Sequence, residues 1–316
     1  MTGLQVIFTA LAALILVEGA GAQSGSSLPD SELRQPTVTV TGTREEQARA
    51  FAERVQPKGW EGAVKGVPRW NSELCISVIG PPVEQGQFIA DRISQRAMDV
   101  GLEAGAPGCD TNLLVIVTND PDALLPAIAR KHRAVFGFTG DANVDTGGSE
   151  ASLAQFIEAD APVRWRQVIQ VVGADGMPLD GDAMVDPLGY ANGFVGTPPG
   201  NLPIVRADST RLRSAVRREL SRVVAVVDTQ QTAGLGLGAV ADYLAFVTLA
   251  DVSAEADMTG FPSILNLFNP QAERQASMTD WDLAFLDGLY ASKPDTASGT
   301  RQYSEIARRI AKAGVD

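Results

Sequence analysis

The sequence has few of the side chains on which metal binding and nucleophilic catalysis depend. Its 316 residues include one histidine, two cysteines and 6% aromatic residues. A single imidazole excludes most histidine-rich metal sites, because such sites place several imidazoles around one ion. Basic residues are also scarce: 26 Lys and Arg stand against 38 Asp and Glu, giving a formal net charge of −12. This balance argues against nonspecific binding to nucleic acid or anionic lipid, and we expect no nucleic-acid partner.

An uncharged apolar run occupies residues 6–17 (VIFTALAALILV). It is shorter than the roughly 20 residues of a transmembrane helix, and Ala20-Gly21-Ala22 after it matches the pattern of a signal peptidase site. We therefore expect a signal peptide over residues 1–22, cleavage after Ala22, and a periplasmic or secreted mature protein without an integral membrane segment. The alternative is an uncleaved anchor, since residues 1–5 contain no Lys or Arg.

The two cysteines, Cys75 and Cys109, flank a predicted βαβ unit. Residues 74–79 (LCISVI) and 113–117 (LLVIV) are typical of buried strands, and residues 84–104 between them have the apolar spacing of a helix. A right-handed crossover makes the two strands parallel, so that their amino-terminal ends lie at one edge. Because an oxidising compartment favours pairing, we predict a structural disulfide between Cys75 and Cys109.

With 45% hydrophobic residues the chain can form a sizeable core, and we expect a mixed α/β (α+β) fold. The amino-terminal part supplies the βαβ unit with parallel strands, and the carboxyl-terminal part supplies a strand and helices. The expected regions are a flexible leader with a short strand (37–41) and helix (44–55) over 23–58, a βαβ-containing unit over 59–160, and a carboxyl-terminal region over 161–316 with an irregular excursion at 173–203. Further helices are expected at 122–136, 149–157, 235–252 and 301–313, another after a Thr279 cap, and strands at 163–172 and 223–227.

Two clusters of charge could bind ligands. Asp175, Asp180, Asp182 and Asp186 offer oxygen ligands of the kind that calcium takes, although the spacing does not fit an EF-hand loop. Six arginines form the densest basic stretch and could dock a phosphate or an acidic partner, or else pair with nearby carboxylates: Arg206, Arg211, Arg213, Arg217, Arg218 and Arg222. Residues 209–222 have the spacing of a helix, but a β-hairpin is equally compatible with the pattern.

Two sequence features that indicate catalysis or cofactor binding in other proteins are incomplete in this chain. His132 lies among basic residues without a nearby carboxylate or nucleophile, and no G-x-S-x-G or S-x-x-K motif occurs. We interpret His132 as a solvated helix residue and predict no catalytic residue. Residues 234–239 (GLGLGA) fit a dinucleotide fingerprint, but that motif needs its first glycine directly after a strand, and the strand is expected to end at Asp228. We therefore expect no cofactor.

The carboxyl-terminal third, residues 223–290, resembles the layout of zincin-like metallopeptidases. The residues that carry the resemblance are the buried strand 223–228, the turn Ser263-Ile264-Leu265-Asn266, and a last helix with Trp281-Asp282 and Leu289-Tyr290. The wider chain is similar to a group of uncharacterised exported proteins of Gram-negative bacteria. The zincin resemblance implies a helix with a His-Glu-x-x-His zinc motif between the strand and the turn.

The chain departs from that motif at the residues that would bind the metal. Ala241 and Ala245 stand at the two ligand positions, and Asp242 stands where the general-base glutamate belongs. Alanine has no lone pair to offer a metal ion, so we predict no metal site. Under the resemblance Ala241, Asp242 and Ala245 mark a vestigial site. The alternative is that Asp242 is the polar edge of a packed helix.

These features favour a non-catalytic exported protein on a degenerate hydrolase-like scaffold, with an envelope protein or a small ligand as its partner. Two alternatives remain open at this point. Paired carboxylates hydrolyse glycosides without histidine or metal, and the chain has 38 acidic residues. The second alternative is a calcium-dependent binding module. A cleft lined by acidic groups beside Asp242 would favour catalysis, whereas a filled core there would leave a binding or a structural role.

Overall fold

The structure is a computed structural model, and it describes residues 42–57, 66–138, 144–145, 150–177, 179 and 209–313. All of these residues belong to one structural unit, Val38–Asp316. The expected signal peptide, the expected strand at 37–41 and most of the excursion at 173–203 lie outside the described residues.

In the described part of the chain, five strands form one sheet in the order β1-β2-β5-β4-β3. The strands are β1 (Ile76–Ile79), β2 (Leu113–Thr118), β3 (Val144–Asp145), β4 (Val163–Gly173) and β5 (Val216–Asp228). β1, β2 and β5 run parallel, whereas β4 is antiparallel to β5 and β3 to β4. The mixed α/β class and the parallel βαβ unit are confirmed. Because β2 pairs with β5, the regions expected at 59–160 and 161–316 contribute to one sheet.

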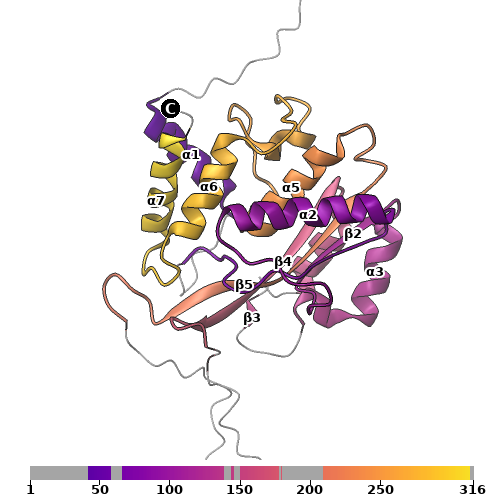
Figure 1. The fold of residues 1–316 in the computed structure, drawn as a ribbon, viewed down its shortest axis with the longest axis horizontal. Coiled ribbons are helices and arrows are strands. Elements are labelled where there is room, and N and C mark those ends of the chain that lie inside the picture. The colour runs from indigo at the N-terminus through magenta and orange to yellow at the C-terminus, as the bar shows by residue number, and fades with distance from the viewer. Residues whose placement is uncertain are drawn as a thin grey trace, which may run out of the picture. The chain divides into compact units, whose positions relative to one another are not determined.

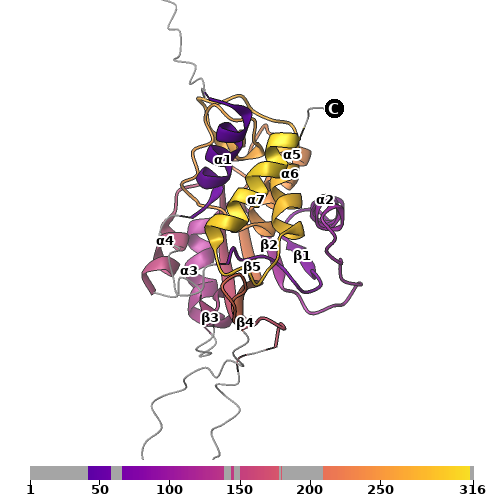
Figure 2. The same cartoon turned by 90° about the vertical axis from the view of Figure 1, so that its left-hand side faces the viewer.

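Helices cover both faces of this sheet (Figures 1 and 2). They are α1 (Arg44–Val55), α2 (Val83–Asp99), α3 (Pro121–Lys131), α4 (Glu150–Glu158), α5 (Leu237–Leu249), α6 (Asp280–Ala291) and α7 (Gly299–Lys312), with short 3₁₀ helices η1 (Arg133–Phe136) and η2 (Ile264–Phe268). Alternate residues of β5 enter different cores, as the two-residue period of a strand requires: Val223 packs with α2 and α5, and Val224 packs with α3 and α4.

Helices α1, α6 and α7 lie side by side beyond the sheet (Figure 1). Tyr303, Ile306 and Ile310 of α7 recur at helical spacing and are buried in the core. The other face of α7 remains exposed to solvent. Arg44 donates from its Nε to the carbonyl of Ala311 at 2.7 Å, which ties the start of α1 to the end of α7.

Local sequence signals explain most helix boundaries. Thr43 with Glu46 and Thr279 with Asp282 each form a capping box, in which side chains satisfy the free N–H groups of the first turn. Gly80 is needed where β1 turns toward α2: its φ is 102°, and an added Cβ would lie 2.0 Å from the carbonyl oxygen of Val117.

Three expectations differ from the structure. Helix α2 ends at Asp99 rather than at Ala104, because Gly101 with φ 83° reverses the chain. The helix expected at 122–136 ends at Lys131, since His132, with φ −132° and ψ 50°, leaves the helical conformation and separates α3 from η1. The stretch 209–222 is not a helix: from Val216 onward it is the first part of β5, paired antiparallel with the preceding strand β4.

Candidate functional site

The helix that would carry a zinc motif, α5, is buried on every side. Ala241, Asp242 and Ala245 have no exposed surface at all, and the remaining residues from Ala239 to Leu249 are buried as well. The position of the would-be general base therefore opens to no cleft. Of the two expectations for this helix, the structure matches the filled core.

Asp242 is held by cations from α2. Arg96 donates from Nε to Oδ1 at 3.0 Å and from Nη2 to Oδ2 at 3.1 Å, and the Nε of Arg92 lies 3.8 Å from Oδ1. The backbone N–H of Met278 donates to Oδ2 at 3.0 Å. The hydrogen bond to Asp242 raises the pKa of the Arg96 guanidinium above its ordinary value. Both carboxylate oxygens are thus engaged in joining α5 to α2 and to the segment before α6.

The residues around Asp242 do not fit a zinc ion. The two neighbouring ligand positions carry the methyl groups of Ala241 and Ala245, and the surrounding charged groups are guanidinium cations, which repel a metal ion. Within the residues that the structure describes, no group of three or more His, Cys, Asp or Glu side chains is placed to hold a metal.

The turn at residues 263–266 and helix α6 both belong to the zincin resemblance. They meet in one hydrogen-bond network around Asp282. Ser263 donates from Oγ to Oδ1 at 2.7 Å, and the N–H groups of Ile264 and Thr279 donate to Oδ2 at 2.8 and 2.9 Å. Burial raises the pKa of Asp282 and outweighs the lowering by these hydrogen bonds, so that the pKa of the carboxyl is about 6. Since Asp282 has no exposed surface, its role is to cap α6 and to anchor the preceding turn.

Asn266 and Tyr290, which also belong to the resemblance, have structural roles. The amide of Asn266 donates to the carbonyls of Met258 and Phe261 at 3.1 and 2.8 Å. The hydroxyl of Tyr290 donates to the carbonyl of Leu249 at 2.6 Å, at the end of α5. Burial raises the pKa of the Tyr290 phenol. These side chains stabilise the packing of α5 and α6 rather than a reactive centre.

Cys75 and Cys109 form the predicted disulfide, with Cα atoms 5.8 Å apart. The bridge connects the residue before β1 to the loop before β2. Asn112 supports the same edge, because its Oδ1 accepts the N–H of Cys75 at 2.8 Å. Neither thiol is available as a nucleophile or a metal ligand.

The two incomplete motifs lie at the end of α3 and in the loop before α5. His132 is exposed at the end of α3, where its backbone N–H donates to the carbonyl of Ile128. Gly234, the first glycine of the fingerprint, lies in the loop between Asp228 at the end of β5 and Leu237 at the start of α5. It does not directly follow the strand, so the geometry of a dinucleotide fingerprint is absent from this described loop.

The two charged clusters lie only partly within the described residues. Asp175 accepts the N–H of Met177 at 3.0 Å in a turn after β4, whereas Asp180, Asp182 and Asp186 lie outside the described residues. Arg206 also lies outside them. The described arginines of the stretch point to different partners: Arg217 pairs with Glu219 at 2.5 Å, and Arg213 pairs with Asp295 at 2.9 Å.

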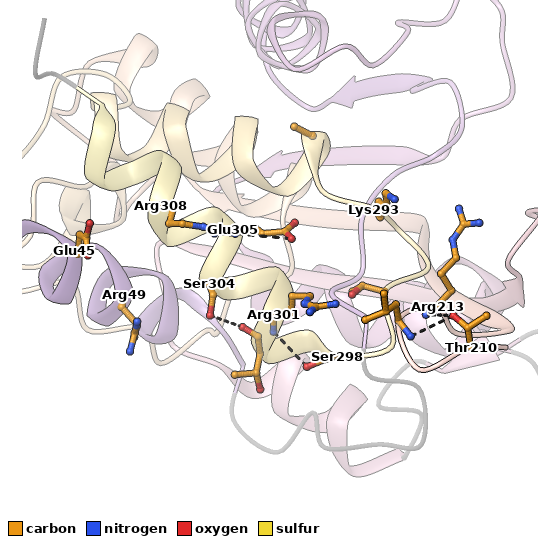
Figure 3. Close-up of a pocket in the computed structure, with 14 residues that line it drawn as sticks. Glu45, Arg49, Thr210, Arg213, Lys293, Ser298, Arg301, Ser304, Glu305 and Arg308 are labelled. Atoms are coloured by element: carbon orange, nitrogen blue, oxygen red, sulfur yellow. Dashed lines mark hydrogen bonds and ion pairs between the residues drawn. The ribbon is translucent and has the colours of Figure 1, made fainter.

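An open groove of about 1150 Å³ lies along α7, between α1 and the segments at 210–213 and 291–298 (Figure 3). Its lining is polar and predominantly basic. The lining residues are Glu45, Arg49, Thr210, Leu212, Arg213, Ala291, Lys293, Thr296, Ser298, Thr300, Arg301, Ser304, Glu305 and Arg308. Five cations thus face two carboxylates, in a chain with a net charge of −12.

Backbone pairing brings Arg213 into this groove from a distant part of the chain. Arg213 forms an antiparallel bridge with Thr296, and the N–H of Ser214 donates to the carbonyl of Asp295 at 2.7 Å. The loop before β5 is therefore fixed against the loop between α6 and α7. Asp295, which is mostly buried, holds the guanidinium of Arg213 in place.

Only one member of this groove, Arg213, was among the candidate residues that the sequence indicated. Arg49, Lys293, Arg301 and Arg308 come from α1, the α6–α7 loop and α7, and their proximity depends on tertiary packing. One signal did exist in the sequence: Arg301 and Arg308 recur at i and i+7, on the face of α7 opposite its apolar positions.

No protein-family model, curated protein or solved structure shows significant similarity to this chain. Among the described residues, no helix has both the length and the apolar character needed to cross a bilayer. The candidate functional site therefore rests on the groove's own geometry and charge.

Proposed function

We propose that the protein is a non-catalytic binding protein that acts outside the cytoplasm, on a scaffold related to that of a hydrolase. The single observation that carries this proposal is the complete burial of Asp242 in its ion pair with Arg96. A general base must reach the proton that it abstracts, directly or through one water. A carboxylate with both oxygens occupied and no exposed surface has no such access.

The groove supports binding as the function. It is open, it is lined by side chains from four segments, and its charge is opposite to that of the whole chain. The Cys75–Cys109 disulfide is compatible with an oxidising extracytoplasmic compartment, and the apolar run at residues 6–17 provides the predicted route of export.

The test is a measurement of turnover with chromogenic ester, phosphomonoester, peptide and glycoside substrates, with and without added Zn²⁺. The proposal predicts the same rate for the native protein as for heat-denatured protein. Turnover that is lost in Asp242→Asn, while the variant stays folded by circular dichroism, would overturn it.

A carboxylate-based glycosidase is the second candidate, because Glu45 and Glu305 line the same groove (Figure 3). Such an enzyme needs two carboxyl groups on opposite sides of the scissile bond. The native protein would then cleave aryl glycosides, and Glu45→Gln or Glu305→Gln would abolish the cleavage. Under the binding proposal, neither variant differs from the wild type in this assay.

A further inference from the structure

The basic groove holds positive charge that the protein itself does not neutralise. Of its five cations, Arg213 pairs with Asp295, and Arg308 lies 4.0 Å from Glu305. Lys293 and Arg301 make no side-chain hydrogen bond or ion pair with any other residue of the described chain, and both are exposed. Figure 3 shows these side chains along the groove, with Lys293 and Arg213 at one end and Arg49 and Arg308 toward the other.

The remaining lining favours a charged ligand over an apolar one. Among the described lining residues, Leu212 and Ala291 are the only apolar members, whereas hydroxyl groups occur along the length of the groove. Ser298 Oγ accepts the N–H of Arg301 at 3.4 Å, and Thr210 Oγ1 accepts that of Arg213 at 3.1 Å. Because each hydroxyl accepts a backbone N–H, it retains its own proton for donation to an anion.

The type of cation indicates which anion fits. Four of the five are arginines, whose planar guanidinium binds phosphate oxygens through two parallel hydrogen bonds. None of the described lining residues is aromatic, so they offer no stacking platform of the kind on which single-stranded nucleic acids bind. The net charge of −12 also repels long polyanions.

The spacing of the cations indicates more than one anionic group. Arg301 and Arg308 are seven residues apart on α7, which corresponds to about 10 Å along the helix axis at ~1.5 Å per residue. Lys293 and Arg213 extend the basic surface beyond Arg301, and Arg49 extends it across to α1. We propose that this groove binds an elongated ligand that carries at least two phosphate groups. This inference rests on the binding function proposed above and names the chemistry of its ligand.

The test is a calorimetric titration with short-chain inorganic polyphosphate as the probe. The groove variant combines Lys293→Glu with Arg301→Glu, and the matched control combines Lys131→Glu with Arg274→Glu, two exposed cations outside the groove. Both variants change the net charge equally, so any effect of overall charge cancels between them. We expect at least about tenfold weaker binding by the groove variant and affinity close to wild type for the control.

Three results would overturn the inference: binding by the wild type of neither polyphosphate nor the phospholipid vesicles described below, equal weakening in both variants, or tighter binding of polyglutamate than of polyphosphate. The last result would assign the groove to an acidic peptide. Matching melting temperatures for the two variants show that the comparison is between folded proteins.

Vesicle flotation distinguishes the two sources of phosphate. If the ligand is a lipid headgroup, the wild type floats with phosphatidylcholine vesicles that contain cardiolipin, a lipid with two phosphate groups, and the groove variant does not. If the ligand is a free phosphorylated compound, polyphosphate binds and neither protein floats. If neither polyphosphate nor the vesicles bind and the protein shows no hydrolytic turnover, this inference alone is overturned. If the protein shows turnover that is lost in Asp242→Asn, the proposed function is overturned.

Discussion

Asp242 on α5 and Arg96 on α2 form a two-point ion pair, with Nε–Oδ1 at 3.0 Å and Nη2–Oδ2 at 3.1 Å. The carboxylate has no exposed surface, and the arginine side chain is 15% exposed. A buried pair of this kind fixes how two helices pack, because either charge alone would be costly inside the protein. The residue that resembles a catalytic base thus serves as a connection between α5 and α2.

We expect Asp242→Ala to destabilise the protein by about 3 kcal/mol, because it leaves Arg96 without its buried partner. Asp99→Ala is the matched control: Asp99 pairs with the same arginine at 3.4 Å but is 40% exposed, so about 1 kcal/mol or less is expected. Urea unfolding followed by tryptophan fluorescence gives both values. Equal losses in the two variants would contradict the structural role of Asp242.

The Asp282 carboxyl makes stability depend on pH. Its pKa is about 6 in the folded protein, against an ordinary value of 3.8 that represents the unfolded chain. Between these values the folded state binds more protons than the unfolded state, so this group's contribution to the unfolding free energy falls as pH rises through the window. That fall should be absent in Asp282→Asn, whose amide can accept the N–H groups and donate to Ser263. The check is urea unfolding of both proteins at pH 4 and pH 7. An unchanged pH dependence in the variant would refute the assignment.

The disulfide should contribute about 4 kcal/mol to stability, because it closes a loop with a sequence separation of 34 residues in the unfolded chain. Cys75→Ser combined with Cys109→Ser is expected to lose that amount in chemical denaturation. Exported, unreduced protein should show no free thiol on titration after unfolding. Two titratable thiols per chain would be inconsistent with the bridge.

Gly80→Ala should cost more stability than Gly101→Ala. Both glycines have positive φ, 102° and 83°, so each substitution adds backbone strain of about 1–3 kcal/mol. At Gly80 the new Cβ also meets the carbonyl oxygen of Val117, whereas nothing lies within 4 Å at Gly101. Comparing the melting temperatures of the two variants isolates the effect of the steric clash at Gly80. Equal melting temperatures would argue against the close approach of β1 and β2 at this turn.

Mature protein is expected to begin at Gln23, since the predicted signal peptidase site ends at Ala22. Amino-terminal sequencing of protein recovered from outside the cytoplasm provides the measurement. A chain that begins at Met1 and remains in the membrane fraction would instead support the uncleaved anchor.

Most of the fold was accessible from local sequence patterns. The β-branched runs at 113–117 and 223–227 predicted buried strands, and Thr279 with its following aspartates predicted the start of α6. The pattern did not define the first part of β5, because Leu212, Val216 and Leu220 also fit helical spacing. Pairing with β4 across the sheet, with a further bridge between Arg69 and Glu219, makes this stretch a strand.

The candidate functional site was far less predictable, for a physical reason. The groove joins Arg49, Arg213, Lys293 and Arg301 from separate segments, and no short-range pattern encodes that proximity. The alanines at 241 and 245 were informative, because they remove metal ligands whatever the fold. Whether Asp242 faced a cleft or a core depended on Arg96, which lies 146 residues away in the sequence.

Carboxyl labelling of the native protein with a carbodiimide and an amine, read by mass spectrometry, tests the burial of Asp242 most directly. We predict that Glu45 and Glu305 in the groove are labelled, while Asp242 is labelled only after unfolding. Labelling of native Asp242 at the rate of Glu45 would show an accessible carboxylate on α5 and would contradict the account.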